Sequence, residues 1–195
     1  MKMQNNDIIA KAIAFAFDAH KDQQRKGSNE PYIMHPLRVF THLIELGITD
    51  TDVLCAAVLH DTIEDCNITA DEIADNFGKT VAELVLTLTE NKLLERTERK
   101  KQILDKMTIA SSKAKLIKAA DRYDNLHDPF PNVWNTEKKL QYLKESKLLI
   151  EALTKNLYDD NCSILVTRLA TSIAAIIDES EQTIHFERNK AHGNS

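Results

Sequence analysis

The stretch AAVLHDTIEDCN, at residues 56–67, places an imidazole and three carboxylates at the end of an apolar segment. The four side chains are those of His60, Asp61, Glu64 and Asp65. Residues four positions apart share one face of a helix, so His60 lies near Glu64 and Asp61 near Asp65. Because such groups are costly to bury without partners, either the helix reaches solvent there or the cluster binds something.

A histidine followed by a carboxylate can hold a divalent cation, but a catalytic site needs further ligands and open positions for water. Two candidates lie elsewhere: His35, directly before Pro36, and Asp121, which follows an apolar helical face in KAADRYDN. Asp121 and Asn125 are again four residues apart. Spacing alone leaves two interpretations open: a metal site, or a histidine at a helix end and a surface carboxylate paired with Arg122.

The bulk composition predicts a helical globular protein. Of the 195 residues, 43% are hydrophobic and 28% are charged, and only four are glycine and four proline. So few turn-forming residues indicate few chain reversals, which favours long helices over many short strands. The net charge of −5 argues against a general nucleic-acid binder, which normally carries a basic surface.

Cysteine usage and the N-terminal segment indicate a cytoplasmic protein. The three cysteines, Cys55, Cys66 and Cys162, lack CxxC spacing and suit free thiols in a reducing compartment. The apolar patches of the first twenty residues are interrupted by charged side chains, so we expect neither a signal peptide nor a membrane span.

Hydrophobic periodicity and turn residues predict the elements that position these groups. We expect helices over residues 7–21, from Pro36, over 51–65, after the capping-box patterns TADE (69–72) and TVAE (80–83), and over 96–108, 111–126, 136–156 and 160–178. His35 should cap the helix that begins at Pro36, because a residue before proline avoids helical geometry. The last 15 or so residues should be frayed. Without a repeat or linker, residues 1–195 are expected to form one all-α domain.

Longer segments resemble a known family. The order of His35, His60-Asp61 and Asp121 is similar to the H…HD…D pattern of the HD-domain metal-dependent phosphohydrolases. AHKDQQRKGSNEPYIMHPLRV, AAVLHDTIEDCNIT, FGKTVAELVLTLTE and KAADRYDNL resemble, in order, the motifs of the RelA/SpoT-type alarmone hydrolase domain. The resemblance is clearest over residues 8–145. The chain lacks the length for synthetase and regulatory domains, so it resembles the stand-alone small alarmone hydrolases.

The resemblance implies a fold, a reaction and a metal. The fold would be a compact HD-domain bundle of roughly eight to ten helices. The reaction would be Mn²⁺-dependent removal of the 3′-pyrophosphate from guanosine tetra- and pentaphosphate, (p)ppGpp. The manganese ligands would be His35, His60, Asp61 and Asp121. The acidic pair Glu64 and Asp65 would position and activate the attacking water.

The resemblance also implies a set of nucleotide contacts. Arg25 matches an arginine that packs against the base, and Lys26 a lysine that approaches phosphate. Asn125 matches an asparagine that reaches the nucleoside. Lys138 and Tyr142 fit a basic residue and a tyrosine at the nucleotide end of the site, although Lys138 stands where an arginine is usual.

Two alternatives are weighed against this hypothesis. The first is another HD-domain nucleotide phosphohydrolase, such as a nucleotidase or an NADPH 2′-phosphatase-like enzyme. The second is an HD domain that binds nucleotides without catalysis; the presence of all four ligand positions and the acidic pair argues against it. The expected partner is a small nucleotide, with no nucleic acid and no membrane, and the sequence leaves the oligomeric state open.

Overall fold

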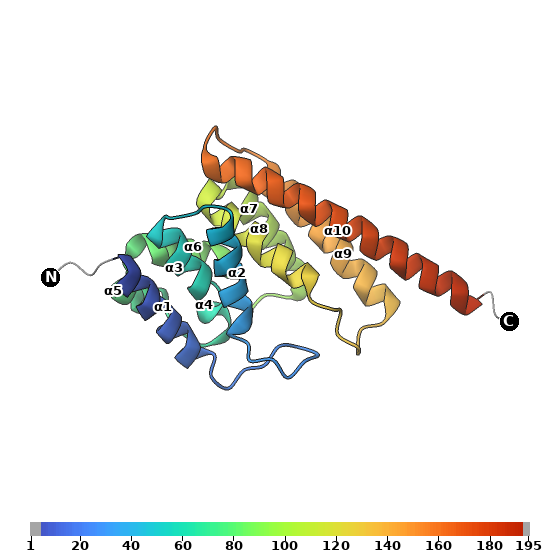
Figure 1. The fold of residues 1–195 in the computed structure, drawn as a ribbon, viewed down its shortest axis with the longest axis horizontal. Coiled ribbons are helices and arrows are strands. Elements are labelled where there is room, and N and C mark those ends of the chain that lie inside the picture. Colours follow the sequence, from blue (N-terminus) through green and yellow to red (C-terminus); the bar gives the residue numbers. More distant parts are fainter. Residues whose placement is uncertain (1–4, 193–195) are drawn as a thin grey trace.

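The computed structural model describes residues 5–192 and is built from helices (Figure 1). Within those residues there are ten helices, and the only β pairing is an isolated bridge between Gln24 and Pro31. The helices are α1 (Asn5–Ala19), α2 (Met34–Glu45), α3 (Thr51–Leu59), α4 (Thr62–Asp65), α5 (Ala70–Phe77), α6 (Lys79–Leu88), α7 (Arg96–Ile109), α8 (Ser112–His127), α9 (Thr136–Thr154) and α10 (Asn161–His192). The predicted all-α class is confirmed.

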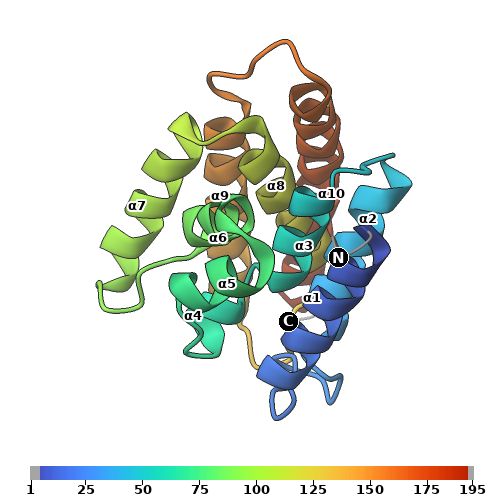
Figure 2. The ribbon, with the colours of Figure 1, turned by 90° about the vertical axis from the view of Figure 1, so that its left-hand side faces the viewer.

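The centre of the molecule is α3, whose residues from Val53 to Leu59 are all buried. Figure 2 shows α3 between α6 on one side and α1 and α2 on the other, and α8 also packs against it. A helix that is apolar all round belongs in a core. The C-terminal end of α3, where the polar cluster begins, is therefore held rigidly in the interior.

The second inner helix is α8, which packs against α2, α6 and α10. Its N-terminus is capped by Ser111, whose hydroxyl accepts a hydrogen bond from the Ala114 N–H at 3.3 Å. Six of its apolar side chains are buried: Ala114, Leu116, Ile117, Ala119, Ala120 and Leu126. This packing carries Asp121, on the same buried face, toward α2 and the end of α3.

One of the two predicted capping boxes is present. At the start of α5, the Thr69 hydroxyl accepts from the Glu72 N–H, and the Glu72 carboxylate accepts from the Thr69 N–H. The prediction of a second capping box at TVAE (80–83) is wrong, because α6 begins earlier than expected. Gly78 adopts a φ of 94° between the two helices, so α6 starts at Lys79 and Thr80 is already inside it.

The helix expected over residues 51–65 is interrupted. The segment α3 ends at Leu59, His60 and Asp61 form a turn, and α4 begins at Thr62. The Thr62 hydroxyl donates to the Leu59 carbonyl at 2.7 Å, which satisfies one of the acceptors that the end of α3 leaves free. The interruption aims His60 and Asp61 in directions that a continuous helix would not allow.

The predicted start of the second helix is also wrong. Since α2 begins at Met34, His35 lies inside its first turn rather than capping it, and Pro36 is its third residue. A proline is tolerated there because the first N–H groups of a helix have no partner within the helix. His35 is consequently held by helical geometry.

The C-terminal segment is more ordered than expected, since α10 continues to His192; residues 193–195 lie outside the described residues. Ile184 is only 6% exposed and packs with Ile177, and the Glu181 carboxylate lies 2.9 Å from the Lys147 ammonium of α9.

By length and composition, residues Asn161–Lys190 would suit a membrane span. In the fold, α10 lies along α8 and α9, and its Ile173, Ile177 and Ile184 side chains pack in a cluster with theirs (Figure 1).

A buried lysine joins the ends of two helices. The Lys115 side chain is fully buried, and its ammonium donates to the Thr108 carbonyl at 3.3 Å and to the Lys155 carbonyl. Those carbonyls lie at the C-terminal ends of α7 and α9, where acceptors lack helical partners. One cation thus stabilises both helix ends.

We expect Lys115→Met to lower the free energy of unfolding by about 2–3 kcal/mol, because two charged hydrogen bonds to helix-end carbonyls are lost while the volume is kept. Lys113→Met is the matched control. Its ammonium forms an ion pair with Asp50 at 2.6 Å, but both side chains are partly exposed, so we expect a loss under about 1 kcal/mol. Denaturant unfolding of the two variants measures both values, and equal losses would contradict the assigned role.

Candidate metal centre and nucleotide pocket

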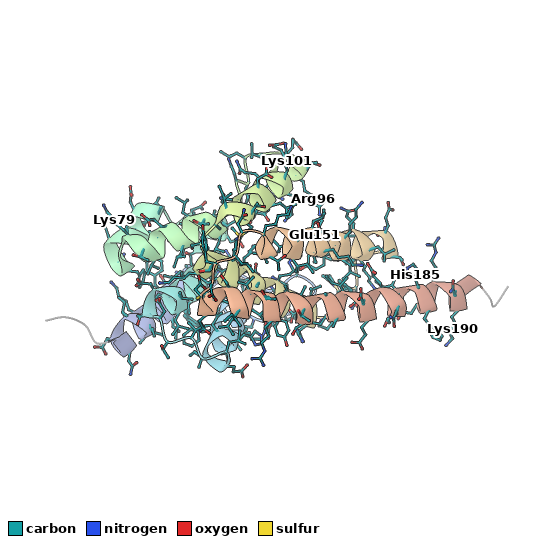
Figure 3. All side chains as sticks on the ribbon, turned by 90° about the horizontal axis from the view of Figure 1, so that it is seen from above. Lys79, Arg96, Lys101, Glu151, His185 and Lys190 are labelled. Atoms are coloured by element: carbon teal, nitrogen blue, oxygen red, sulfur yellow. The ribbon has the colours of Figure 1, made fainter. Side chains whose placement is uncertain are left out.

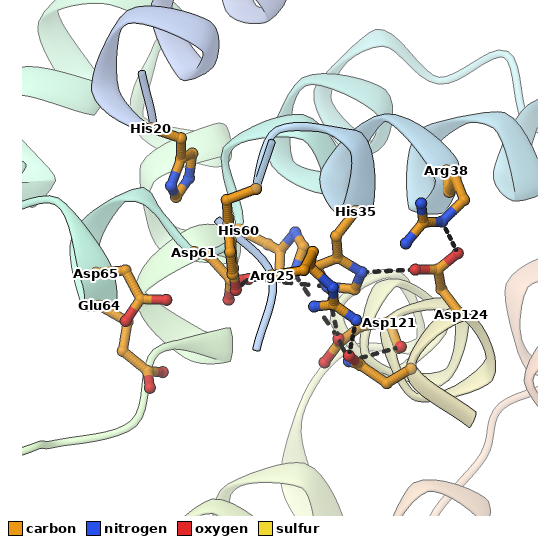
Figure 4. Close-up of polar contacts among 12 residues, drawn as sticks. His20, Arg25, His35, Arg38, His60, Asp61, Glu64, Asp65, Asp121 and Asp124 are labelled. Atoms are coloured by element: carbon orange, nitrogen blue, oxygen red, sulfur yellow. Dashed lines mark hydrogen bonds and ion pairs between the residues drawn. The ribbon is translucent and has the colours of Figure 1, made fainter. Parts of the chain in front are cut away.

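Four predicted ligands from three parts of the chain meet at one point (Figure 4). His35 comes from α2, His60 and Asp61 from the turn after α3, and Asp121 from α8. His35 Nε2 lies 3.2 Å from Asp121 Oδ1, and His60 Nε2 lies 3.1 Å from Asp61 Oδ2. The crossed distances, from His35 to Asp61 and from His60 to Asp121, are 3.8 and 3.9 Å. These four side chains could share one cation.

The hydrogen bonds of the two imidazoles orient them toward that point. His60 Nδ1 lies 2.8 Å from the Ala57 carbonyl, and His35 Nδ1 lies 2.7 Å from Asp124 Oδ2. Because both acceptors require a proton on Nδ1, each ring turns Nε2 toward the carboxylates, and Nε2 is the nitrogen left to bind a cation. This is the arrangement in which histidine binds a metal.

The donor set fits a divalent metal ion. Within the described residues, His60 Nε2 is buried and makes no hydrogen bond, although it lies close to both carboxylates. Ligand atoms of His35, His60 and Asp121 all lie within 4.8 Å of one another, and all three residues are buried. Two imidazole nitrogens with carboxylate oxygens are of intermediate softness and suit a first-row divalent metal.

Electrostatics in this cluster favour positive charge. Burial opposes protonation of His60, but Asp61 and Asp121 outweigh it and raise the pKa of the imidazole to about 9. Burial likewise opposes the charge of Lys118, yet Asp121, 2.8 Å away, raises the pKa of its ammonium. The two carboxylates therefore impose a negative potential that a cation would neutralise.

Asp124 supports His35 and was missed by the sequence analysis. It is 2% exposed and accepts from His35 Nδ1 and, at 2.8 Å, from Arg38 Nε; His42 Nε2 lies 3.4 Å away. Burial opposes its ionisation, but the hydrogen bonds from His35 and Arg38 lower the pKa of the carboxyl to about 2. The available signal was its position three residues after Asp121, on the same face of α8.

Each metal-site carboxylate has a further partner. The Tyr32 hydroxyl donates to Asp61 Oδ2 at 2.7 Å, and the Asn125 amide donates to Asp121 Oδ1 at 2.5 Å. Burial and the neighbouring Asp61 raise the pKa of Tyr32, so the hydroxyl stays protonated and remains a donor. Tyr32 was not identified from the sequence, because it lies in a loop whose path the sequence did not define.

A cavity of about 830 Å³ adjoins the metal centre. It is bounded by the loop after α1, the end of α8, the segment after it and α9. Of the residues predicted from sequence, those lining it are Arg25, Lys26, Asp65, Asn125 and Tyr142. Lys138 does not line the cavity: it is exposed, and its ammonium lies 4.8 Å from the Trp134 ring centre. The volume is in the range of small-molecule sites.

Arg25 is held firmly in this cavity. Its guanidinium donates to Asp128 Oδ2 at 2.6 Å and to Asn125 Oδ1 at 2.9 Å, and it lies 5.8 Å from the Tyr32 ring centre. Because Asn125 also bonds Asp121, two hydrogen bonds connect the cavity wall to the metal centre. The planar cation is thereby positioned before a ligand arrives.

The acidic pair lies beside the four ligands (Figure 4). Glu64 accepts a hydrogen bond from the Glu90 N–H at 3.0 Å, and Asp65 pairs with the Lys92 ammonium. Burial raises the pKa of the Glu64 carboxyl above its usual value, which makes the carboxylate a stronger base. Asp65 lines the large cavity, whereas Glu64 is not among its lining residues.

Comparison with known proteins places the chain in a family. The HD domain profile matches residues 12–157. The Xenopus tropicalis protein named guanosine-3′,5′-bis(diphosphate) 3′-pyrophosphohydrolase MESH1 is 40% identical over 75% of this chain and 84% of its own length. The Homo sapiens MESH1 is 38% identical over 74% of this chain and 84% of its own length. An Aquifex aeolicus hydrolase of the same name, without the MESH1 label, is 35% identical, but only 22% of it is covered.

A solved structure agrees with these relatives. The structure described as a metazoan ortholog of SpoT that hydrolyzes ppGpp superposes with a TM-score of 0.75 at 33% identity, over 85% of this chain and 94% of that one. The fold and the His/Asp cluster define an HD-domain protein. Within that family, the chain belongs with the pyrophosphohydrolases of the MESH1 type, so the resemblance inferred from sequence is confirmed.

We expect Asp124→Asn to weaken metal binding about 10- to 100-fold while the fold is kept, because the carboxylate that fixes the His35 ring is replaced by an amide. Titration of metal into stripped protein, with circular dichroism as the folding check, measures this. Asp128→Asn is the control: Asp128 also accepts from Arg38 but does not touch His35. Equal losses in the two variants would show that the arginine network matters rather than His35 orientation.

Proposed function

We propose that this protein is a Mn²⁺-dependent hydrolase that removes the 3′-pyrophosphate of ppGpp and pppGpp, giving GDP or GTP and pyrophosphate. One observation carries the proposal: a two-histidine, two-aspartate cluster lies beside a nucleotide-sized cavity, in a chain that spans most of the length of the MESH1 relatives. His35, His60, Asp61 and Asp121 would hold the metal. The free thiols support action in the cytoplasm.

The cavity would bind the nucleoside and orient its 3′ end. Arg25, fixed by Asp128, offers a planar cation on which a purine can stack. Asn125 reaches both Arg25 and Asp121, so it can position the sugar close to the metal centre. Tyr142 closes the inner wall, and Lys26 supplies an exposed positive charge at the rim. Lys138, outside the cavity wall, would contribute only long-range attraction.

The reaction is the addition of water to the phosphorus bonded to the 3′ oxygen. A bound divalent cation supplies Lewis acidity toward the water and the phosphoryl oxygens. Glu64, held by the Glu90 N–H, would take a proton from the water, while Asp65, held by Lys92, would help orient it. A bond forms between the water oxygen and phosphorus, the bond from phosphorus to the 3′ oxygen breaks, and that oxygen gains a proton. Pyrophosphate leaves intact.

Incubation with ppGpp should yield GDP and pyrophosphate in equal amounts, resolved by chromatography across a panel that includes NADPH and nucleoside monophosphates. Preferential release of single phosphate from NADPH or a monophosphate would move the protein to the alternative phosphohydrolase class.

Asp61→Ala should lose both bound metal and activity while remaining folded, because one ligand and the partner of Tyr32 are removed. Full activity after chelation would exclude a metal-dependent reaction.

Glu64→Gln and Asp65→Asn should each keep metal content near wild type but lower kcat about 10²–10⁴-fold, the usual contribution of a general base. Glutamine can still accept the Glu90 N–H, so the shape of the site is preserved. If the two act as a unit, the double variant loses less than the product of the single losses. Metal content and kcat are measured side by side; loss of metal with either substitution would make that residue a ligand or its support.

A further inference from the structure

A second, smaller cavity lies between α7, α8 and α9 and has a volume of about 290 Å³. Five cationic side chains line it, with two carboxylates and several apolar groups. The cations are Arg96, Lys100, Lys101, Lys118 and Arg122, and the carboxylates are Glu90 and Glu145. Figure 3 shows Arg96 and Lys101 near each other on α7, with Lys79 well away from them at the start of α6. In a chain of net charge −5, this is a local concentration of positive charge.

The two carboxylates neutralise only part of this charge. Glu90 is paired with Arg99 and Lys100, at 3.1 and 2.7 Å, and Glu145 with Arg96 at 2.7 Å. Lys101 has no ion pair with a carboxylate within the part of the chain that the structure describes. The positive charge of the cavity is therefore partly uncompensated.

Arg122 is the best-placed donor. Its Nη1 donates to the Ser146 hydroxyl at 2.8 Å, and its guanidinium carbon lies 4.7 Å from the Tyr142 ring centre. Its Nε is buried and has no hydrogen-bond partner among the described residues, and no carboxylate there pairs with it. A guanidinium without a carboxylate partner favours an anion with several acceptor oxygens, such as phosphate.

The cavity adjoins the metal centre on a side different from the nucleotide pocket. Lys118 lines it and lies 2.8 Å from Asp121 Oδ2, and the main chain of Glu90, another lining residue, holds Glu64. Tyr142 lines the nucleotide pocket, while Arg122 lies over the Tyr142 ring. Tyr142 and Arg122 therefore lie where the nucleotide pocket and the basic cavity adjoin.

We propose that the basic cavity between α7, α8 and α9 binds a phosphate or diphosphate group. Its volume lies at the lower limit of small-molecule sites, which suits a group of the size of an inorganic diphosphate. The identity of the natural occupant rests on the proposed function. It is either the released pyrophosphate or the 5′-diphosphate of the bound nucleotide. Both present the same chemistry to Arg122 and Lys101.

The test is calorimetric titration of inorganic pyrophosphate into metal-loaded protein. Arg122→Gln should weaken binding about tenfold or more, because a charged hydrogen-bond donor is lost. Lys101→Gln, at an exposed position that the fold tolerates, should weaken it a few-fold, and less at high salt. Lys79→Gln removes one charge at the start of α6, outside the cavity lining, and should change nothing. Wild-type affinity in both cavity variants, with metal content unchanged, would overturn the proposal.

Steady-state kinetics with ppGpp separate the two sources of the diphosphate. A raised KM in the cavity variants identifies the 5′-diphosphate of the substrate, whereas weaker product inhibition at unchanged KM identifies released pyrophosphate. The proposed function fails by itself if the wild type does not hydrolyse ppGpp while pyrophosphate binding still depends on Arg122. The cavity proposal fails by itself if ppGpp is hydrolysed and both variants match the wild type in KM and in pyrophosphate affinity.

Discussion

The burial of two carboxylates beside two imidazoles is the constraint around which the rest of the structure is arranged. Asp61 and Asp121 approach within 4 Å of the same ring nitrogens. An isolated buried carboxylate would be strongly destabilising, so each needs several partners. Tyr32, Asn125 and Lys118 supply hydrogen bonds or charge. A divalent cation would complete the compensation, which explains why a helix as apolar as α3 ends in acidic groups.

The hydrogen-bond partners of the metal-site residues also connect the metal centre to the nucleotide pocket. From His35 the contacts run through Asp124, Arg38 and Asp128 to Arg25, and a second route runs from Asp121 through Asn125 to Arg25. Because the groups that would bind the nucleoside are bonded to those that would bind the metal, the two parts of the site form one preorganised unit. Preorganisation of this kind lowers the cost of ordering the site when the substrate binds.

Much of the fold was predictable because its helices carry strong local signals. The bounds of α7 and α8, the Gly78 break and the Thr69 capping box follow from periodicity, turn residues and side-chain chemistry. The errors fall where tertiary contacts decide. The turn at His60 and Asp61 carries no proline or glycine to mark it. The end of α10 is helical because Ile184 and Glu181 find partners on neighbouring helices, which no local pattern reveals.

The sequence by itself determined the helical class, the family and the identity of the groups proposed to hold a metal, because those residues fall within short, ordered motifs. Only the tertiary structure decided which side chains support them. Asp124 lies 89 residues from His35, and Arg25 lies 103 residues from Asp128. The basic cavity likewise exists only because α7, α8 and α9 pack together. Hydrogen bonds and charges act over a few ångströms in space, and separation along the chain does not encode that distance.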